Sequence, residues 1–202
     1  MAGRSPSEAF HNFIAPMNRA LTCVSAGGRL SISREHAQSS FHTNVDYAAT
    51  LTAGDAVRLR GTSTPLWLGI RHAFLIVEGA GDRGPYKTTT VGYSYRFHAD
   101  IGHDRSEILA FQWNRDASPP LRKYPHLHIG SAISRGSSFR QDDFSDLHIP
   151  TGRLSLEAVL LFAIQELGVE PAENRSHRSV LDVLIEGDRI FREWSTQAGD
   201  WY

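Results

Sequence analysis

The sequence predicts that residues 1–202 form a single α+β domain, in which a twisted, mainly antiparallel sheet follows one helix and precedes two more. Three observations favour this fold class. Helical periodicity is confined to the two ends of the chain, strand-like alternation fills the middle, and the turns between strand-like runs suit antiparallel neighbours better than helical crossovers. With 202 residues, 41% of them hydrophobic, the chain is long enough to bury one core.

An N-terminal helix is expected within residues 1–28. Ser5 is a favourable N-cap, Pro6 suits the first helical position and Glu8 stands at the third, which is a capping-box pattern. The pair Gly27–Gly28 is predicted to end the helix. Apolar residues at steps of three and four should pack it against the sheet; they are Phe10, Phe13, Met17, Leu21 and Val24.

The antiparallel sheet is expected in residues 45–133. Its strands are predicted from runs rich in β-branched and aromatic residues, separated by Gly, Pro, Asp and Asn. These runs are 45–52, 56–60, 66–78, 88–98, 107–114 and 125–133. Residues 134–154, which begin with the polar stretch SRGSSFRQDD, are predicted to be a loop.

Two helices are expected in residues 155–196. Ser155 is the predicted N-cap of the first, Gly168 ends it and Pro171 prevents its continuation. The second helix covers about 176–196. Its predicted buried side consists of Val180, Leu184, Ile185, Phe191 and Trp194.

Composition excludes several classes of protein. No apolar run reaches the roughly 20 residues of a membrane span, and the N-terminus does not resemble a secretion signal, so we expect a cytoplasmic protein without membrane contact. The only cysteine is Cys23, which excludes an internal disulfide and a multi-cysteine zinc site; we expect it to pack within the N-terminal helix. A formal charge of −1 argues against coating of nucleic acid through bulk charge, so any RNA contact must be local.

Three successive strands each have an apolar and a polar side, because successive side chains of a strand point to opposite faces. The apolar sides consist of Tyr93, Tyr95, Phe97, Leu109, Phe111, Trp113, Leu127 and Ile129. If the strands pair antiparallel and in register, their polar sides form one surface. The residues gathered there would be Arg96, His98, Gln112, His126 and His128.

This surface has the residues needed for acid and base catalysis. His126 and His128 lie one residue apart in KYPHLHIG, with Cα atoms roughly 6.5 to 7 Å apart, so protonation of one ring disfavours protonation of the other. In-line attack on phosphorus places base and acid on opposite sides, and we therefore expect His98 to act with one of this pair. Arg96 would stabilise charge on a phosphate.

Substrate contacts are expected from Lys123, Tyr124, Gln112 and Asn114, and no cofactor is expected. Other interpretations stay open. Two histidines on the solvent side of a strand require no function. An H-x-H strand can also chelate zinc, with a third ligand from His98, His148 or a carboxylate. His148 itself, which precedes a proline and a helix cap, is interpreted as structural.

The region from residue 91 to about 167 resembles the small TumE-like toxins of prokaryotic toxin–antitoxin pairs. The similar segments are YSYRFH, ILAFQWN, PLRKYPHLHIG and SLEAVLLFAIQEL, in that order. The matching positions are His98, Trp113, Asn114, Pro125, His126 and His128. The chain departs from the family pattern after Trp113–Asn114, where it has RDASPP in place of a histidine pair.

The resemblance implies a growth-inhibiting cytoplasmic toxin with a cognate antitoxin protein as its partner. Together with the histidines and Arg96, it leads to the hypothesis of a metal-independent ribonuclease, with RNA as substrate and histidine acid–base catalysis. A non-catalytic protein that uses the same polar face, or residues 134–143, to capture a cellular partner is the alternative. A zinc-dependent hydrolase is the third option.

Overall fold

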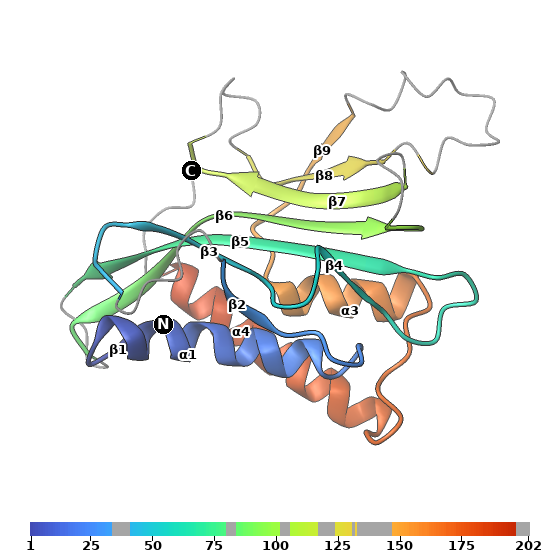
Figure 1. The fold of residues 1–202 in the computed structure, drawn as a ribbon, viewed down its shortest axis with the longest axis horizontal. Coiled ribbons are helices and arrows are strands. Elements are labelled where there is room, and N and C mark those ends of the chain that lie inside the picture. Colours follow the sequence, from blue (N-terminus) through green and yellow to red (C-terminus); the bar gives the residue numbers. More distant parts are fainter. Residues whose placement is uncertain are drawn as a thin grey trace.

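One antiparallel sheet and three helices form the described part of the protein, which confirms the predicted α+β class (Figure 1). The computed structural model describes residues 1–33, 41–79, 84–101, 106–116, 124–130, 132 and 147–196. The helices are α1 (Pro6–Leu21), α3 (Leu156–Glu166) and α4 (His177–Thr196). The strands are β1 (Ala2–Gly3), β2 (Leu30–Ile32), β3 (Asp46–Leu51), β4 (Ala56–Arg58), β5 (Trp67–Glu78), β6 (Tyr86–His98), β7 (Glu107–Asn114), β8 (His126–Ile129) and β9 (His148–Pro150).

The strands pair in the order β2-β3-β5-β6-β7-β8-β9, and every pair is antiparallel. β1 pairs with the beginning of β6, and β4 pairs with β5. The predicted strands agree closely with β3 to β7. β8 is shorter than the predicted 125–133: the amides of Gly130 and Ala132 still donate to the carbonyls of Ile108 and Glu107, but outside the regular ladder.

All three helices lie against one face of the sheet (Figure 1). Tyr95 and Phe97 of β6 are fully buried on that face. Phe74 of β5 stacks on Phe10 of α1, with ring centroids 5.6 Å apart. No helix of the described chain covers the other face, which carries the intervening side chains such as the exposed Arg96. The period-two pattern of the strands therefore divides the sheet into a core face and an open face.

The N-terminal helix is shorter than the predicted 1–28. Ser5 caps it as expected, since its hydroxyl accepts the amide N–H of Glu8. The helix nevertheless ends at Leu21, because the backbone turns and the Ser25 hydroxyl donates to the Leu21 carbonyl at 2.8 Å. Ser25 then bridges to Leu59, which draws the chain toward the sheet. Cys23 is buried, but it lies beyond the helix rather than within it.

The predicted loop at 134–154 is wrong at His148–Pro150, where β9 pairs antiparallel with β8. Residues 133–146 lie outside the described residues. β9 has only three residues and ends at Pro150, so neither length nor alternation distinguishes it from a loop in the sequence. This short strand places His148 directly opposite His128.

The two C-terminal helices occupy the predicted positions. The Ser155 hydroxyl accepts the amide of Ala158 and donates to a carboxylate oxygen of Asp188 at 2.8 Å, so the cap of α3 also ties it to α4. Ile185 was predicted on the buried side of α4 but is 57% exposed, because the side of the helix that faces the core carries Val180 and Leu184. None of the described helices is both long and apolar enough to span a membrane.

A buried histidine lies on the core face of β5. His72 is 1% exposed; its Nδ1 bonds to the Tyr95 hydroxyl at 2.8 Å and its Nε2 to the Thr90 hydroxyl at 2.9 Å. One nitrogen donates and the other accepts, so the neutral ring satisfies both hydroxyls. Burial lowers the pKa of His72 from 6.5 to about 3. The protonated ring is therefore incompatible with this core.

We predict that His72 makes the fold sensitive to acid. Because the folded pKa lies below the unfolded value, the unfolded chain takes up the proton first as pH falls, and stability is lost between about pH 6.5 and pH 3. Between pH 7 and pH 4 the wild type should lose on the order of 3 kcal/mol more than His72→Gln, which cannot titrate there. Urea unfolding of both proteins at pH 7, 5 and 4 measures this difference. Parallel pH dependences would contradict it.

Candidate functional site

The register of β6, β7, β8 and β9 aligns the polar side chains of the open face in two rows. In one row Ser94 pairs with Gln112, which pairs with His126. In the next row Arg96 pairs with Ala110, Ala110 with His128, and His128 with His148. The structure therefore brings Arg96, Gln112, His126 and His128 onto one surface. Ala110 lies between Arg96 and His128 in this row, and its small side chain leaves space between their two side chains.

A hollow of about 500 Å³ opens on this surface. It crosses five strands, from β5 to β9, and its polar lining consists of Arg71, Ser94, Arg96, Glu107, Gln112, Asn114, His126, His128 and His148. The lining includes groups that can donate or accept protons. The size of the hollow is sufficient for a small molecule or one unit of a polymer.

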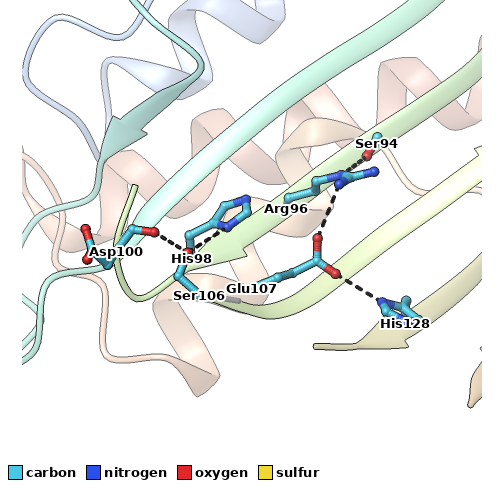
Figure 2. A network of polar contacts seen from close by, with 7 residues as sticks. All are labelled: Ser94, Arg96, His98, Asp100, Ser106, Glu107 and His128. Carbon is cyan, nitrogen blue, oxygen red and sulfur yellow. Dashed lines mark hydrogen bonds and ion pairs between the residues drawn. The ribbon is translucent and has the colours of Figure 1, made fainter. Parts of the chain in front are cut away.

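Glu107 connects Arg96 to His128 (Figure 2). Its Oε1 accepts the Nδ1–H of His128 at 3.0 Å, and its Oε2 pairs with the Arg96 guanidinium at 3.5 Å. The Arg96 Nε–H also donates to the Ser94 hydroxyl at 2.9 Å. The single carboxylate thus fixes both the orientation of the guanidinium and the tautomer of the imidazole, whose basic nitrogen is Nε2.

A β-bulge places Glu107 on the open face. Phe97 pairs with Leu109, but His98 pairs with Glu107, so Ile108 is an extra residue in β7. By simple alternation Glu107 would share the core face with Leu109, and for this reason sequence patterning missed it. The bulge lets Ile108 pack against the core while Glu107 turns toward Arg96.

His126 and His148 complete the histidine cluster. The Nδ1–H of His126 donates to the Tyr124 carbonyl at 2.8 Å, which leaves Nε2 as its basic nitrogen. The His148 ring lies 4.6 Å from the His126 ring and 5.6 Å from the His128 ring, measured between centroids. His148, interpreted from sequence as structural, therefore belongs to the site. Sequence analysis considered His148 only as a possible zinc ligand, because the three-residue β9 was too short to be found by its pattern.

His98 lies apart from the other three histidines. In Figure 2 it and His128 lie on opposite sides of Glu107. His98 lines a second hollow, of about 520 Å³, which shares Arg96 with the first. The Ser106 hydroxyl donates to the Asp100 carbonyl, so at 3.3 Å from His98 it accepts the Nδ1–H and Nε2 is again the basic nitrogen.

The pKa of His98 is lowered from its ordinary value, primarily by burial. The Glu107 carboxylate opposes this shift and the Arg96 guanidinium reinforces it. At neutral pH the ring is therefore predominantly neutral and able to accept a proton.

The predicted substrate contacts divide into three groups. Gln112 and Asn114 line the first hollow. Tyr124 is 64% exposed and is not among the described residues of that lining; its carbonyl, however, orients His126. Lys123 lies outside the described residues. Arg71 on β5, which sequence analysis did not select, lines both hollows.

Within the described residues, no three His, Cys, Asp or Glu side chains are arranged to hold a metal ion. Searches with this chain match no protein-family model, no curated protein and no solved structure.

We predict opposite effects on His98 from the two charged neighbours. Glu107→Gln removes a negative charge, so the pKa of His98 should fall further; Arg96→Gln removes a positive charge, so it should rise. Both shifts should be smaller than those caused by a direct hydrogen bond, because the two charges act on the ring through space. NMR titration of the His98 ring protons measures both, with His177→Gln on α4 as a control. Shifts in the same direction would contradict the geometry.

Proposed function

We propose that the protein cleaves RNA without a metal ion, by histidine acid–base catalysis, and acts as the toxin of a toxin–antitoxin pair. The observation that carries the catalytic part is the position of Arg96, which lines both hollows, with His98 in one and His126, His128 and His148 in the other. A phosphate bound by this guanidinium has a histidine on each side. In-line displacement at phosphorus requires a base and an acid in that relation.

His98 is the proposed base. Its ring is predominantly neutral at neutral pH because burial lowers its pKa, and the Ser106 hydroxyl accepts the Nδ1–H, which leaves Nε2 as the basic nitrogen. Nε2 removes the proton of the ribose 2′-hydroxyl, whose oxygen then forms a bond to the adjacent phosphorus. Because the nucleophile belongs to the substrate, the enzyme supplies only proton transfer and charge stabilisation.

His128 is the proposed acid. It donates a proton from Nε2 to the departing 5′-oxygen as the bond between phosphorus and that oxygen breaks. Glu107 accepts the Nδ1–H at 3.0 Å, so the carboxylate holds the ring in place while Nε2 donates. The products are a 2′,3′-cyclic phosphate and a 5′-hydroxyl, and no further reactant is needed. His126 and His148 lie beside His128 and are the nearest groups to exchange protons with it.

Arg96 is the proposed stabiliser of the charge that accumulates on phosphorus. Its guanidinium is half exposed and is oriented by Ser94 and Glu107, so its remaining N–H donors can reach a phosphate oxygen. Donors that are already oriented need little reorganisation in the transition state. The nearby carboxylate weakens the net positive charge of the site, but it also prevents the guanidinium from turning away.

The toxin role, the antitoxin partner and the cytoplasmic location depend on the TumE-like resemblance in residues 91–167. The rival hypothesis is a binding protein that uses the same open face to hold a partner and catalyses nothing. Only cleavage distinguishes the two, because both require the same exposed side chains.

We predict metal-free cleavage by purified protein. In the presence of EDTA the wild type should convert RNA to products ending in a 2′,3′-cyclic phosphate. His98→Ala and His128→Ala should each lower kcat/KM by about 10² to 10⁴, the usual contribution of a proton-transfer group. His177→Ala, an exposed histidine on α4, is the matched control. Binding without cleavage would support the rival protein, and activity only with added zinc would support a hydrolase that uses the histidines as ligands.

We also predict a phenotype in cells. Expression of the wild type should arrest growth, and His98→Ala, His126→Ala and His128→Ala should each relieve the arrest. His177→Ala should remain toxic, which controls for loss of an exposed histidine. Colony counts after induction, with protein levels measured by blotting, test this. If all variants arrest growth equally, the site assignment fails.

A further inference from the structure

The second hollow, which His98 lines, continues across the open face to strands that carry none of the proposed catalytic groups. It is about 520 Å³ in volume and lies over β3, β5 and β6, where its lining includes Thr50, Asp55, Arg71, Ser94, Arg96 and His98. Arg71, Ser94 and Arg96 also line the first hollow. The two hollows therefore meet at these three shared residues and form one depression across the sheet.

Arg71 differs from Arg96 in its surroundings. Arg96 is paired with Glu107, whereas Arg71 is exposed and no described carboxylate forms an ion pair with it. Asp55 is the one carboxylate in the described lining of the second hollow. Thr50, which pairs with Arg71 across the β3–β5 ladder, contributes a hydroxyl there. An arginine that has no ion-pair partner among the described residues and lies in a concave polar site is suited to an anionic ligand.

The spacing of the two arginines matches a ligand with more than one phosphate. Arg71 pairs with Ser94, and Arg96 lies two residues further along the same strand, so the two positions are diagonal neighbours. Cα atoms in this relation are roughly 7 to 8 Å apart. Both side chains extend from the open face, and this separation is comparable to that of successive phosphates along an extended nucleic-acid strand.

We propose that the second hollow is a nucleotide subsite in which Arg71 binds the phosphate next to the scissile one, so that the substrate is a single-stranded RNA segment with at least two phosphates. This inference rests on the proposed function, because Arg96 is taken to hold the scissile phosphate. A single strand fits the chemistry, since the regular duplex does not place the 2′-oxygen in line with the departing 5′-oxygen. Asp55, in the lining of the same hollow, is the proposed acceptor of a hydrogen bond from a base or a ribose of the bound nucleotide.

Binding of a non-cleavable RNA tests the subsite directly. A fluorescent 2′-O-methyl trinucleotide with two phosphates should bind the wild type about tenfold more tightly than Arg71→Gln, as expected for loss of one charged hydrogen-bonding contact. The plot of log K against log salt concentration should be shallower by about 0.7 for the variant. Arg58→Gln, an exposed strand arginine outside both hollows, should bind like the wild type. Equal affinity and slope for wild type and Arg71→Gln would overturn the subsite.

Kinetics separate this inference from the proposed function. The wild type should have a higher kcat/KM for a two-phosphate RNA than for a dinucleoside monophosphate, and Arg71→Gln should reduce that ratio about tenfold. Cleavage of both RNAs with a ratio unchanged by Arg71→Gln would overturn the subsite and leave the ribonuclease intact. Absence of cleavage, with Arg71-dependent binding of the 2′-O-methyl RNA, would overturn the ribonuclease and retain the nucleotide site.

Discussion

The period-two alternation of the central strands is the constraint on which both the core and the candidate site depend. Tyr95 and Phe97 are completely buried against the helices, which fixes the register of β6 relative to its neighbours. A shift of one residue would move Arg96 into the core and these rings into solvent. The burial of the aromatic face therefore determines which side chains are available on the open face. The candidate site on this sheet depends on packing on its other side.

The one departure from alternation in β7 is what organises the polar residues into a network. The bulge at Ile108 transfers Glu107 from the core face to the open face, where it contacts both Arg96 and His128. Without this carboxylate the guanidinium and the imidazole would be two independent surface groups. Bulges are common beside active sites because one extra residue re-aims a side chain at small cost to the ladder.

Three histidines of the open face, His98, His126 and His128, form the same kind of hydrogen bond through Nδ1. Each uses Nδ1–H as a donor, although the acceptors differ: a backbone carbonyl for His126, a carboxylate for His128 and a hydroxyl for His98. In the neutral form of each ring Nε2 is therefore the basic nitrogen. Their surroundings differ in charge and burial, which is how a fold can assign different proton-transfer roles to one residue type. His72 illustrates the opposite case, a histidine whose two nitrogens are both engaged within the core.

The sequence by itself determined the helices, the central strands and the polar face, because hydrophobic periodicity and capping are local properties of the chain. Arg96, Gln112, His126 and His128 could be placed on one surface by alternation alone, given antiparallel pairing. Only the tertiary structure decided the roles of Glu107, His148 and Arg71. The bulge that exposes Glu107 depends on how β7 pairs with β6, the three-residue β9 exists only as a partner of β8, and Arg71 meets Arg96 through the register of β5 and β6. These are contacts between distant segments, and no local pattern in the chain encodes them.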